Sequence, residues 1–338
     1  MSLAPEIRRP GTDVSPVERL HALVAADMRA TDVTIHERLS SAVSLIPDLS
    51  RHLIDSGGKR LRPLLTLAAA AMGGYGGREH VKLAAAVEFI HTATLLHDDV
   101  VDESALRRGK VSANIVWGNK PSVLVGDFLF SRAFELMVEP DDADVLAILA
   151  RASRIIAEGE VMQLKSANNL AATEEHYLEV VSAKTAALFA AAAESGAVLA
   201  RGMGAYAFSM HDYGQNLGVA FQLVDDALDY SGRQALMGKS VGDDFREGKV
   251  TLPVILAYAR ADETARKFWK RTIETGPQGE RDLDRAITLV EETGAIADTM
   301  ARARVYAGHA RRALEPVAAS EMRDVLADVA DFCVERAY

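Results

Sequence analysis

Two runs of aspartate in the sequence have the same spacing, and each reads D-D-x-x-D. They are Asp98, Asp99 and Asp102 in LLHDDVVDES, and Asp225, Asp226 and Asp229 in FQLVDDALDY. On an α-helix, residues four apart share a face, so Asp98 lies over Asp102 while Asp99 is turned about 100° aside. Carboxylate oxygens are the ligands that Mg²⁺ prefers, and this ion commonly bridges one or two carboxylates to substrate phosphates. The two runs therefore predict two facing metal sites that bind a diphosphate across a cavity.

A solvated acidic helix face is the alternative explanation for either run. In a protein with a formal charge of -10, one isolated run would not distinguish the two explanations. The second copy favours metal sites. The apolar neighbours Leu95, Leu96, Leu223 and Val224 also favour them, because a fully exposed helix seldom carries such residues on both sides of its acids.

Basic residues near the first run could bind phosphate. In GGKRLRP, two glycines precede Lys59, Arg60 and Arg62, and a proline then begins a helix whose N-terminus itself attracts anions. Arg107 and Arg108 follow the first aspartate run. Because these two arginines are adjacent, they would point in different directions on a helix and could serve two different phosphates. A solvated basic loop is the alternative for each segment.

Two later segments contain lysines that could also bind phosphate. Lys184 and Thr185 interrupt the alanine-rich run SAKTAALFAAAA, where Lys184 either binds a ligand or extends its charge to water along an aliphatic stem. Lys239 and Lys249 lie in GKSVGDDFREGKVTLP. That glycine-containing loop also holds Asp243, Asp244, Arg246 and Glu247. Such a loop can close over a ligand or can simply be a charged surface connection.

The remaining sequence predicts an all-α fold. Alanine-rich segments with apolar residues three or four apart recur from Pro16 to the end, and alternating β-type runs are almost absent. Helices are expected at residues 17–45, 63–72, 79–103, 121–138, 141–168, 173–201 and 206–230, with shorter ones from residue 252 onward. Since no Pro-, Gly- or Ser-rich linker divides the chain, we expect a flexible N-terminal tail at residues 1–14 and a single all-helical domain at residues 15–338.

Composition excludes several classes of protein. With 338 residues, of which 49% are hydrophobic and 25% charged, the chain can bury a large core. The negative net charge argues against nucleic-acid binding, which depends on clustered Lys and Arg. Cys333 is the only cysteine, so a disulfide framework is excluded and a cytoplasmic location is expected. Uninterrupted apolar runs are shorter than the roughly 18–20 residues of a membrane-spanning helix, so at most peripheral membrane contact is expected.

Taken together and in this order, the motifs resemble those of the trans-isoprenyl diphosphate synthases, the polyprenyl synthetase family, over residues 59–253. The resemblance implies a domain of long antiparallel helices around a deep central cavity, usually as a homodimer. It also implies a Mg²⁺-dependent prenyltransferase, with about three ions per active site and with Mn²⁺ able to replace Mg²⁺. The reaction would be sequential head-to-tail addition of isopentenyl diphosphate to an allylic diphosphate by ionisation, condensation and elimination.

The resemblance assigns roles to individual residues. The direct metal ligands would be Asp98, Asp102 and Asp225, and the other aspartates of the two runs would bind the metal or position its ligands. All six, together with Arg107 and Lys184, would form the catalytic set. The isopentenyl diphosphate site would contain Lys59, Arg62, His91 and Arg108. The allylic diphosphate site would contain Arg107, Lys184, Thr185, Gln222, Lys239 and Lys249. For His91, a hydrogen-bonded core position is the alternative.

Small residues before the first run bear on product length. Ala93 and Thr94 precede Asp98 by about one helical turn, where a bulky aromatic would block a growing chain. Small residues there resemble the long-chain synthases, of the octaprenyl or decaprenyl type, that make quinone side chains. We therefore expect a product longer than a geranylgeranyl chain, which Ala93→Phe should shorten. A deeper floor of the cavity could be formed by Phe89, Phe128, Phe130 or Phe134.

Four other functions compete with this interpretation. A short-chain synthase making farnesyl or geranylgeranyl diphosphate would share the motifs. A terpene cyclase would replace the second aspartate run. A non-catalytic partner subunit of a heteromeric synthase would have lost acidic or basic ligands, and both runs are complete here. An acidic helical metal-storage or docking protein would not explain the ordered basic motifs.

Overall fold

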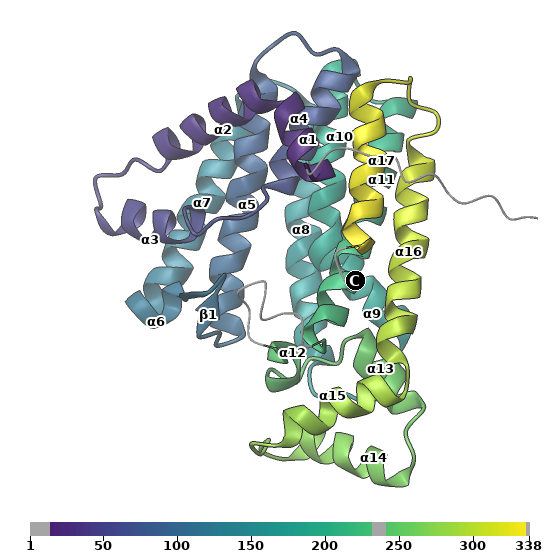
Figure 1. The fold of residues 1–338 in the computed structure, drawn as a ribbon. Helices are drawn as coiled ribbons and strands as arrows, with labels where there is room; N and C mark the ends of the chain where they lie inside the picture. Colours follow the sequence, from purple (N-terminus) through teal and green to yellow (C-terminus); the bar gives the residue numbers. More distant parts are fainter. Residues whose placement is uncertain (1–13, 232–240, 336–338) are drawn as a thin grey trace, which may run out of the picture.

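Helices make up nearly all of the fold in the computed structural model, which describes residues 14–231 and 241–335 (Figure 1). The strands assigned within those ranges are β1 (Leu106–Arg107) and β2 (Lys110–Val111), which pair antiparallel with Leu106 opposite Val111. The predicted all-α class is therefore confirmed. Of the tail predicted at residues 1–14, only Val14 lies within the described residues, where it is exposed.

The N-terminal region differs from its prediction. Instead of one helix over residues 17–45, the chain forms α1 (Pro16–Leu23), α2 (Ala25–Arg38) and α3 (Leu45–Ile54). Val24 ends α1 because its backbone leaves the helical region, with φ -117° and ψ 21°. Leu20, Val24 and Met28 are nevertheless all buried. Since the four-residue apolar spacing continues across the break, the pattern alone predicts a single helix.

Long helices form the centre of the molecule (Figure 1). They are α4 (Leu61–Gly73), α5 (Glu79–Val101), α7 (Asn119–Val138), α8 (Ala143–Ser166), α10 (Ala187–Arg201) and α11 (Ala205–Asp229). Helix α10 packs against α4, α8 and α11. Its residues from Ala187 to Val198 are buried, and Thr66 of α4 donates a hydrogen bond to the carbonyl of Ala192 at 2.9 Å. Small side chains allow this close approach.

The helix predicted over residues 173–201 is divided in the structure. It consists of α9 (Glu174–Val181), a π-helical turn (Ser182–Ala186) and then α10. The π-helical turn is the segment that carries the Lys184 motif. A turn of this kind inserts one residue into a regular helix and is frequent at functional sites.

The remaining helices complete the fold. They are α6 (Ala113–Trp117), α12 (Asp243–Arg246), α13 (Leu252–Ala259), α14 (Glu263–Trp269), α15 (Asp282–Glu292), α16 (Ala295–Ala313) and α17 (Glu321–Glu335), with a second π-helical turn at Lys270–Thr275. Helices α16 and α17 pack along α11. In Figure 1, α12 to α15 lie together at the lower end of the molecule.

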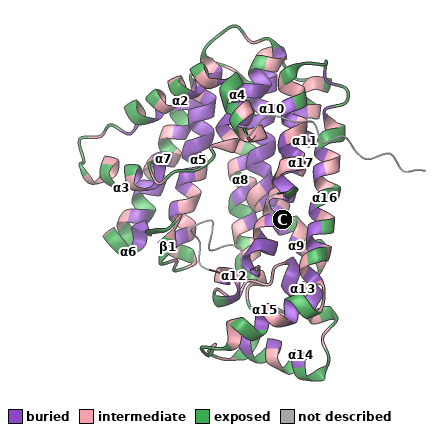
Figure 2. Ribbon diagram, in the orientation of Figure 1, coloured by how far each residue is buried: buried purple, intermediate pink, exposed green. Residues whose placement is uncertain are grey.

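Buried apolar residues form two clusters, and Figure 2 shows that buried positions follow the central helices. The first cluster lies among the N-terminal helices, α10 and α17, and the second surrounds the end of α11 and α13 to α16. Helix α11 contributes to both, with Leu217 in the first cluster and Val219 in the second. No helix of the described residues combines the length and the apolar character needed to cross a membrane.

Candidate active site

A cavity of about 890 Å³ brings the predicted motifs together. It is lined by the start of α4, the end of α5, the β1 segment, α8, α9, the π-helical turn, the end of α11 and the loop around α12. The predicted residues that line it are Lys59, Arg62, His91, Thr94, Asp98, Asp102, Arg107, Arg108, Lys184, Thr185, Gln222, Asp225, Asp226, Asp229 and Lys249. Asp99 and Ala93 are not among them. Lys239 lies outside the described residues.

The first aspartate run meets two lysines from distant segments. Lys184 Nζ lies 3.8 Å from Asp98 Oδ2, and Lys249 Nζ lies 2.7 Å from Asp102 Oδ2. Lys184 also forms an ion pair with Glu160 of α8. Burial raises the pKa of Asp98 to about 6, an effect that Lys184 opposes and Glu160 reinforces. A further cation near Asp98 would therefore favour its ionised form.

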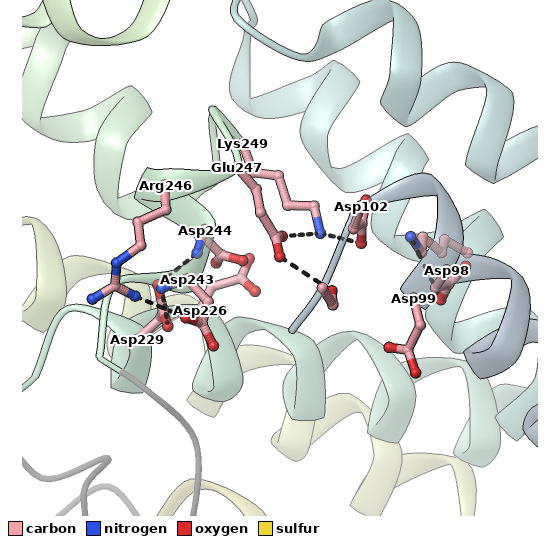
Figure 3. Close-up of polar contacts among 12 residues, drawn as sticks. Asp98, Asp99, Asp102, Asp226, Asp229, Asp243, Asp244, Arg246, Glu247 and Lys249 are labelled. Carbon is pink, nitrogen blue, oxygen red and sulfur yellow. Dashed lines mark hydrogen bonds and ion pairs between the residues drawn. The ribbon is translucent and has the colours of Figure 1, made fainter. Parts of the chain in front are cut away.

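Asp99 faces away from the cavity and binds Arg107. It is 0% exposed, and its Oδ1 accepts a hydrogen bond of 2.7 Å from Nε of Arg107. Asn114 of α6 donates to the Asp99 carbonyl at 2.9 Å. Arg107 itself lines the cavity. Asp99 thus positions Arg107. Figure 3 shows the side chains of Asp98 and Asp99 pointing in different directions, as expected for the middle residue of the run.

The second aspartate run divides into one half-buried residue and two buried ones. Asp225 is half-buried and lines the cavity. Asp226 accepts hydrogen bonds from Tyr177 at 2.5 Å and from Gln222 at 2.7 Å. The carboxylate of Asp229 accepts from the backbone N–H groups of residues 243 and 244, at 3.2 and 3.1 Å, and so binds the N-terminus of α12. In Figure 3, Asp226 and Asp229 lie on one side of Glu247 and Lys249, and Asp98 and Asp99 lie on the other.

Burial controls the protonation of these two acids. It raises the pKa of Asp226 and of Asp229 to about 8 in each case, and the carboxylate of Asp244 adds to the shift. For Asp226, the hydrogen bonds from Tyr177 and Gln222 act in the opposite direction. The second run is therefore an electrostatically unfavourable group of acids that a positive ligand would stabilise.

The π-helical turn directs Lys184 and Thr185 into the cavity. Thr185 donates a hydrogen bond to the side chain of Gln222 at 2.9 Å. Gly159 of α8 allows α8 to approach this turn, because a Cβ on that residue would lie 2.7 Å from the backbone nitrogen of Lys184. Any larger residue at 159 would push Lys184 away from its two acidic partners.

Arginines at the start of α4 form the other half of the site. Arg62 is stacked on Phe189, with 4.2 Å from Cζ to the ring centroid, and its Nη1 lies 3.2 Å from Nε2 of His91. Burial, together with Arg62 and Arg108, keeps the pKa of His91 well below its usual value. His91 is therefore neutral and accepts this hydrogen bond. Arg108, in a left-handed conformation with φ 52°, donates to the carbonyl of Gly57.

Sequence reasoning missed several cavity residues that carry a charge or a hydroxyl, among them Glu88, Glu160 and Tyr177. Glu88 forms an ion pair of 3.3 Å with Nη1 of Arg60. A signal for Glu88 existed, because it precedes His91 by three residues and Asp98 by ten, which places all three on one face of α5. Glu160 and Tyr177 offered no comparable pattern, since their partners lie on other helices.

The predicted product wall is only partly at the cavity. Thr94 lines it, with Leu95 and Ile156. Ala93 is fully buried in the first hydrophobic cluster instead. Of the four phenylalanines proposed as a floor, Phe130 lines the cavity, whereas Phe89, Phe128 and Phe134 do not.

An all-helical cavity in which two D-D-x-x-D runs face lysines and arginines defines a prenyltransferase of the isoprenoid diphosphate class. The polyprenyl synthetase family model matches residues 43–290. Octaprenyl diphosphate synthase of Escherichia coli (strain K12) is 42% identical over 320 residues, which cover 95% of this chain and 99% of that protein. The chain belongs to the polyprenyl synthetase family, and it is therefore a prenyltransferase.

Solved structures agree with this assignment. A polyprenyl synthase from Caulobacter crescentus CB15, complexed with calcium and isoprenyl diphosphate, is 53% identical, with a TM-score of 0.93 and coverage of 97% of this chain and 100% of that chain. A decaprenyl diphosphate synthase from Rhodobacter capsulatus is 53% identical, with a TM-score of 0.91 and coverage of 96% and 100%. The relatives thus include long-chain trans-polyprenyl diphosphate synthases.

Enzymes of this family are generally metal-dependent, and the donor set of the cavity fits a hard divalent cation. Asp98, Asp102 and Asp225 present carboxylate oxygens to the cavity from α5 and α11. Within residues 14–231 and 241–335, no three carboxylate, imidazole or thiolate side chains are close enough to hold an ion by themselves. Mg²⁺ needs no such cage, because it retains water and bridges carboxylates to substrate phosphates.

Proposed function

We propose that this prenyltransferase lengthens an allylic diphosphate by sequential head-to-tail addition of isopentenyl diphosphate. The observation that supports this most directly is that five of the six aspartates of the two runs line one cavity together with residues of the basic motifs. Lys59, Arg62, His91 and Arg108 would bind isopentenyl diphosphate. The allylic diphosphate would be bound by Arg107, Lys184, Thr185, Gln222, Lys249 and the undescribed Lys239.

The metal ligands in this proposal are Asp98, Asp102 and Asp225. About three Mg²⁺ ions per site, or Mn²⁺ in their place, would supply positive charge to the departing diphosphate. Arg107 and Lys184 donate hydrogen bonds to the same leaving group and so stabilise the charge that develops on it. Arg107 is held for this task by Asp99, and Lys184 by Glu160.

The apolar part of the cavity serves the carbon skeleton. Leu95, Phe130 and Ile156 provide a wall that excludes water from the allylic cation. The double bond of isopentenyl diphosphate attacks that cation, and the released diphosphate accepts the proton that leaves in the elimination step. No protein nucleophile is needed.

A product longer than a geranylgeranyl chain is part of the proposal. Thr94 leaves space below Asp98, and the octaprenyl and decaprenyl synthases among the relatives carry names that denote long products. A short-chain product is the second candidate. The observation in its favour is that Phe130 lines the cavity, where its ring could block a growing chain. The other three phenylalanines proposed as a floor do not line it.

We further propose that the enzyme is a homodimer and that residues 15–338 act as one domain. Helix α7 carries an exposed apolar face, with Leu124 67%, Phe134 44% and Val138 59% exposed, and a second copy could cover it. The single domain is supported by α11, which contributes to both hydrophobic clusters. A cytoplasmic location and at most peripheral membrane contact stay predictions.

An incorporation assay tests the function. The purified chain is incubated with Mg²⁺, radiolabelled isopentenyl diphosphate and either a geranyl or a farnesyl diphosphate primer, and products are measured by mass spectrometry. Label should enter polyprenyl products longer than geranylgeranyl. No incorporation would contradict the proposal, and activity that required a second polypeptide would indicate a partner subunit instead.

A further inference from the structure

Asp226, the middle residue of the second run, is held by side chains on two helices. Tyr177 of α9 donates its hydroxyl to Asp226 Oδ2 at 2.5 Å, and Gln222, one turn earlier on α11, donates its amide to Oδ1 at 2.7 Å. Asp226 is 3% exposed. The two donors therefore replace water at both carboxylate oxygens, and loss of either would leave a buried oxygen without its donor.

The series of hydrogen bonds continues to the π-helical turn. Thr185 Oγ1 donates to Gln222 Oε1 at 2.9 Å, and Lys184 is its neighbour in that turn. Tyr177 and Asp226 thus begin an unbroken series that ends beside the lysine. Because Asp225 adjoins Asp226 and lines the cavity, any movement of Asp226 would disturb both diphosphate-binding elements together.

We propose that Tyr177 is a positioning residue for the prenyl transfer. Its hydroxyl orients Asp226 and, through the hydrogen-bond series, keeps the second aspartate run and the Lys184 turn in the relative arrangement that binds the allylic diphosphate. This inference rests on the proposed function, since it concerns the same site. Tyr177 reaches Asp226 from another helix, so its role depends on geometry and not on a local motif.

A purely structural role is the alternative, because the Tyr177 ring is buried in the second hydrophobic cluster. Tyr230 provides a matched control. Its side chain is also buried and follows Asp229 directly, yet within the described part of the chain its hydroxyl has no hydrogen-bond partner. Substitution of either tyrosine by phenylalanine removes one oxygen and keeps the ring.

The test compares Tyr177→Phe and Tyr230→Phe with the wild type. The measurements are kcat, the KM of each substrate, the Mg²⁺ concentration for half-maximal activity and the melting temperature. Tyr177→Phe should lower kcat and raise the Mg²⁺ requirement by roughly 10- to 100-fold, the range typical of residues that orient metal ligands. Its KM for isopentenyl diphosphate should stay unchanged, because Lys59 and Arg62 lie outside the series. Tyr230→Phe should match the wild type.

A double-mutant cycle separates positioning from packing. Tyr177→Phe combined with Gln222→Ala should lose less activity than the product of the two single losses, because both side chains act through Asp226. Tyr230→Phe combined with Gln222→Ala should show no such coupling.

All variants are assayed at a temperature where circular dichroism shows them folded. The proposal is overturned if Tyr177→Phe has the kcat and the Mg²⁺ requirement of Tyr230→Phe. It is equally overturned if Tyr177→Phe does not fold at any temperature, since the hydroxyl would then serve folding. A wild-type enzyme that incorporates no isopentenyl diphosphate would instead contradict the proposed function itself.

Discussion

Lys249 Nζ lies 2.7 Å from Asp102 Oδ2, so the loop after α12 is bound directly to the end of α5 (Figure 3). Burial alone would lower the pKa of Lys249, but the carboxylates of Asp102, Asp244 and Glu247 outweigh it and raise that pKa, so the lysine stays charged. Because Asp229 binds the N-terminus of α12, residues 243–249 connect the two aspartate runs.

Lys249→Ala should lower kcat/KM for the allylic diphosphate by about tenfold or more. The reason is that a buried hydrogen bond to a charged group contributes roughly 1.5–3 kcal/mol. The KM for isopentenyl diphosphate should not change. Lys267→Ala is the control, because that lysine is exposed and pairs with Glu263 one turn away on the surface. Equal activity of the two variants would contradict a role for Lys249 in the site.

Chelation of divalent metal should abolish incorporation and lower the melting temperature modestly, without unfolding the protein. Lys184 and Lys249 already offset the charge of Asp98 and Asp102 in the protein alone, so folding does not require the metal. Activity is measured with EDTA and after addition of Mg²⁺ or Mn²⁺, and unfolding is followed by calorimetry. Undiminished activity in EDTA would refute the metal-dependent mechanism.

Thr94→Phe should shorten the product because its side chain lines the cavity below Asp98. Ala93→Phe, expected from the sequence to have this effect, would place a ring in the packed core, where overpacking costs roughly 1–3 kcal/mol. Mass spectrometry of the products and melting temperatures separate the two outcomes. Thr94→Ser is the control, and an unchanged product ladder for Thr94→Phe would rule out this wall.

His91→Gln should make stability less sensitive to acid. The pKa of His91 is lowered in the folded protein, so below the usual value of 6.5 the unfolded chain binds a proton that the folded chain does not. The free energy of unfolding therefore falls as the pH drops. Relative to His91→Gln, the wild type should lose roughly 1 kcal/mol between pH 6.5 and 5.5, measured by urea denaturation. If the free energy of unfolding changed with pH in the same way for the wild type and for His91→Gln, a buried and neutral His91 would be contradicted.

The long central helices could be predicted from the sequence because their apolar spacing and their boundaries are local features. The break at Val24 could not, since apolar spacing persists across it. The π-helical turn at residues 182–186 could not either, because it packs against Gly159 of α8, a contact between segments far apart in the sequence.

The site was predictable as a set of residues but not as a set of contacts. The D-D-x-x-D spacing predicts that Asp99 turns aside, and the structure agrees. Its partner Arg107 lies eight residues away across a turn, and the partners of Asp98 and Asp102 lie on other segments. Long-range pairs of this kind are set by tertiary packing, which one sequence does not specify residue by residue.

The extra residue in the π-helical turn makes chain length critical at this point. Deleting one residue between Ser182 and Ala186 would restore a regular helix and keep α9 in line with α10, but Lys184 and Thr185 would lose the wide turn that directs them into the cavity. The number of residues in this internal turn is therefore as important to the site as the identity of Lys184 and Thr185.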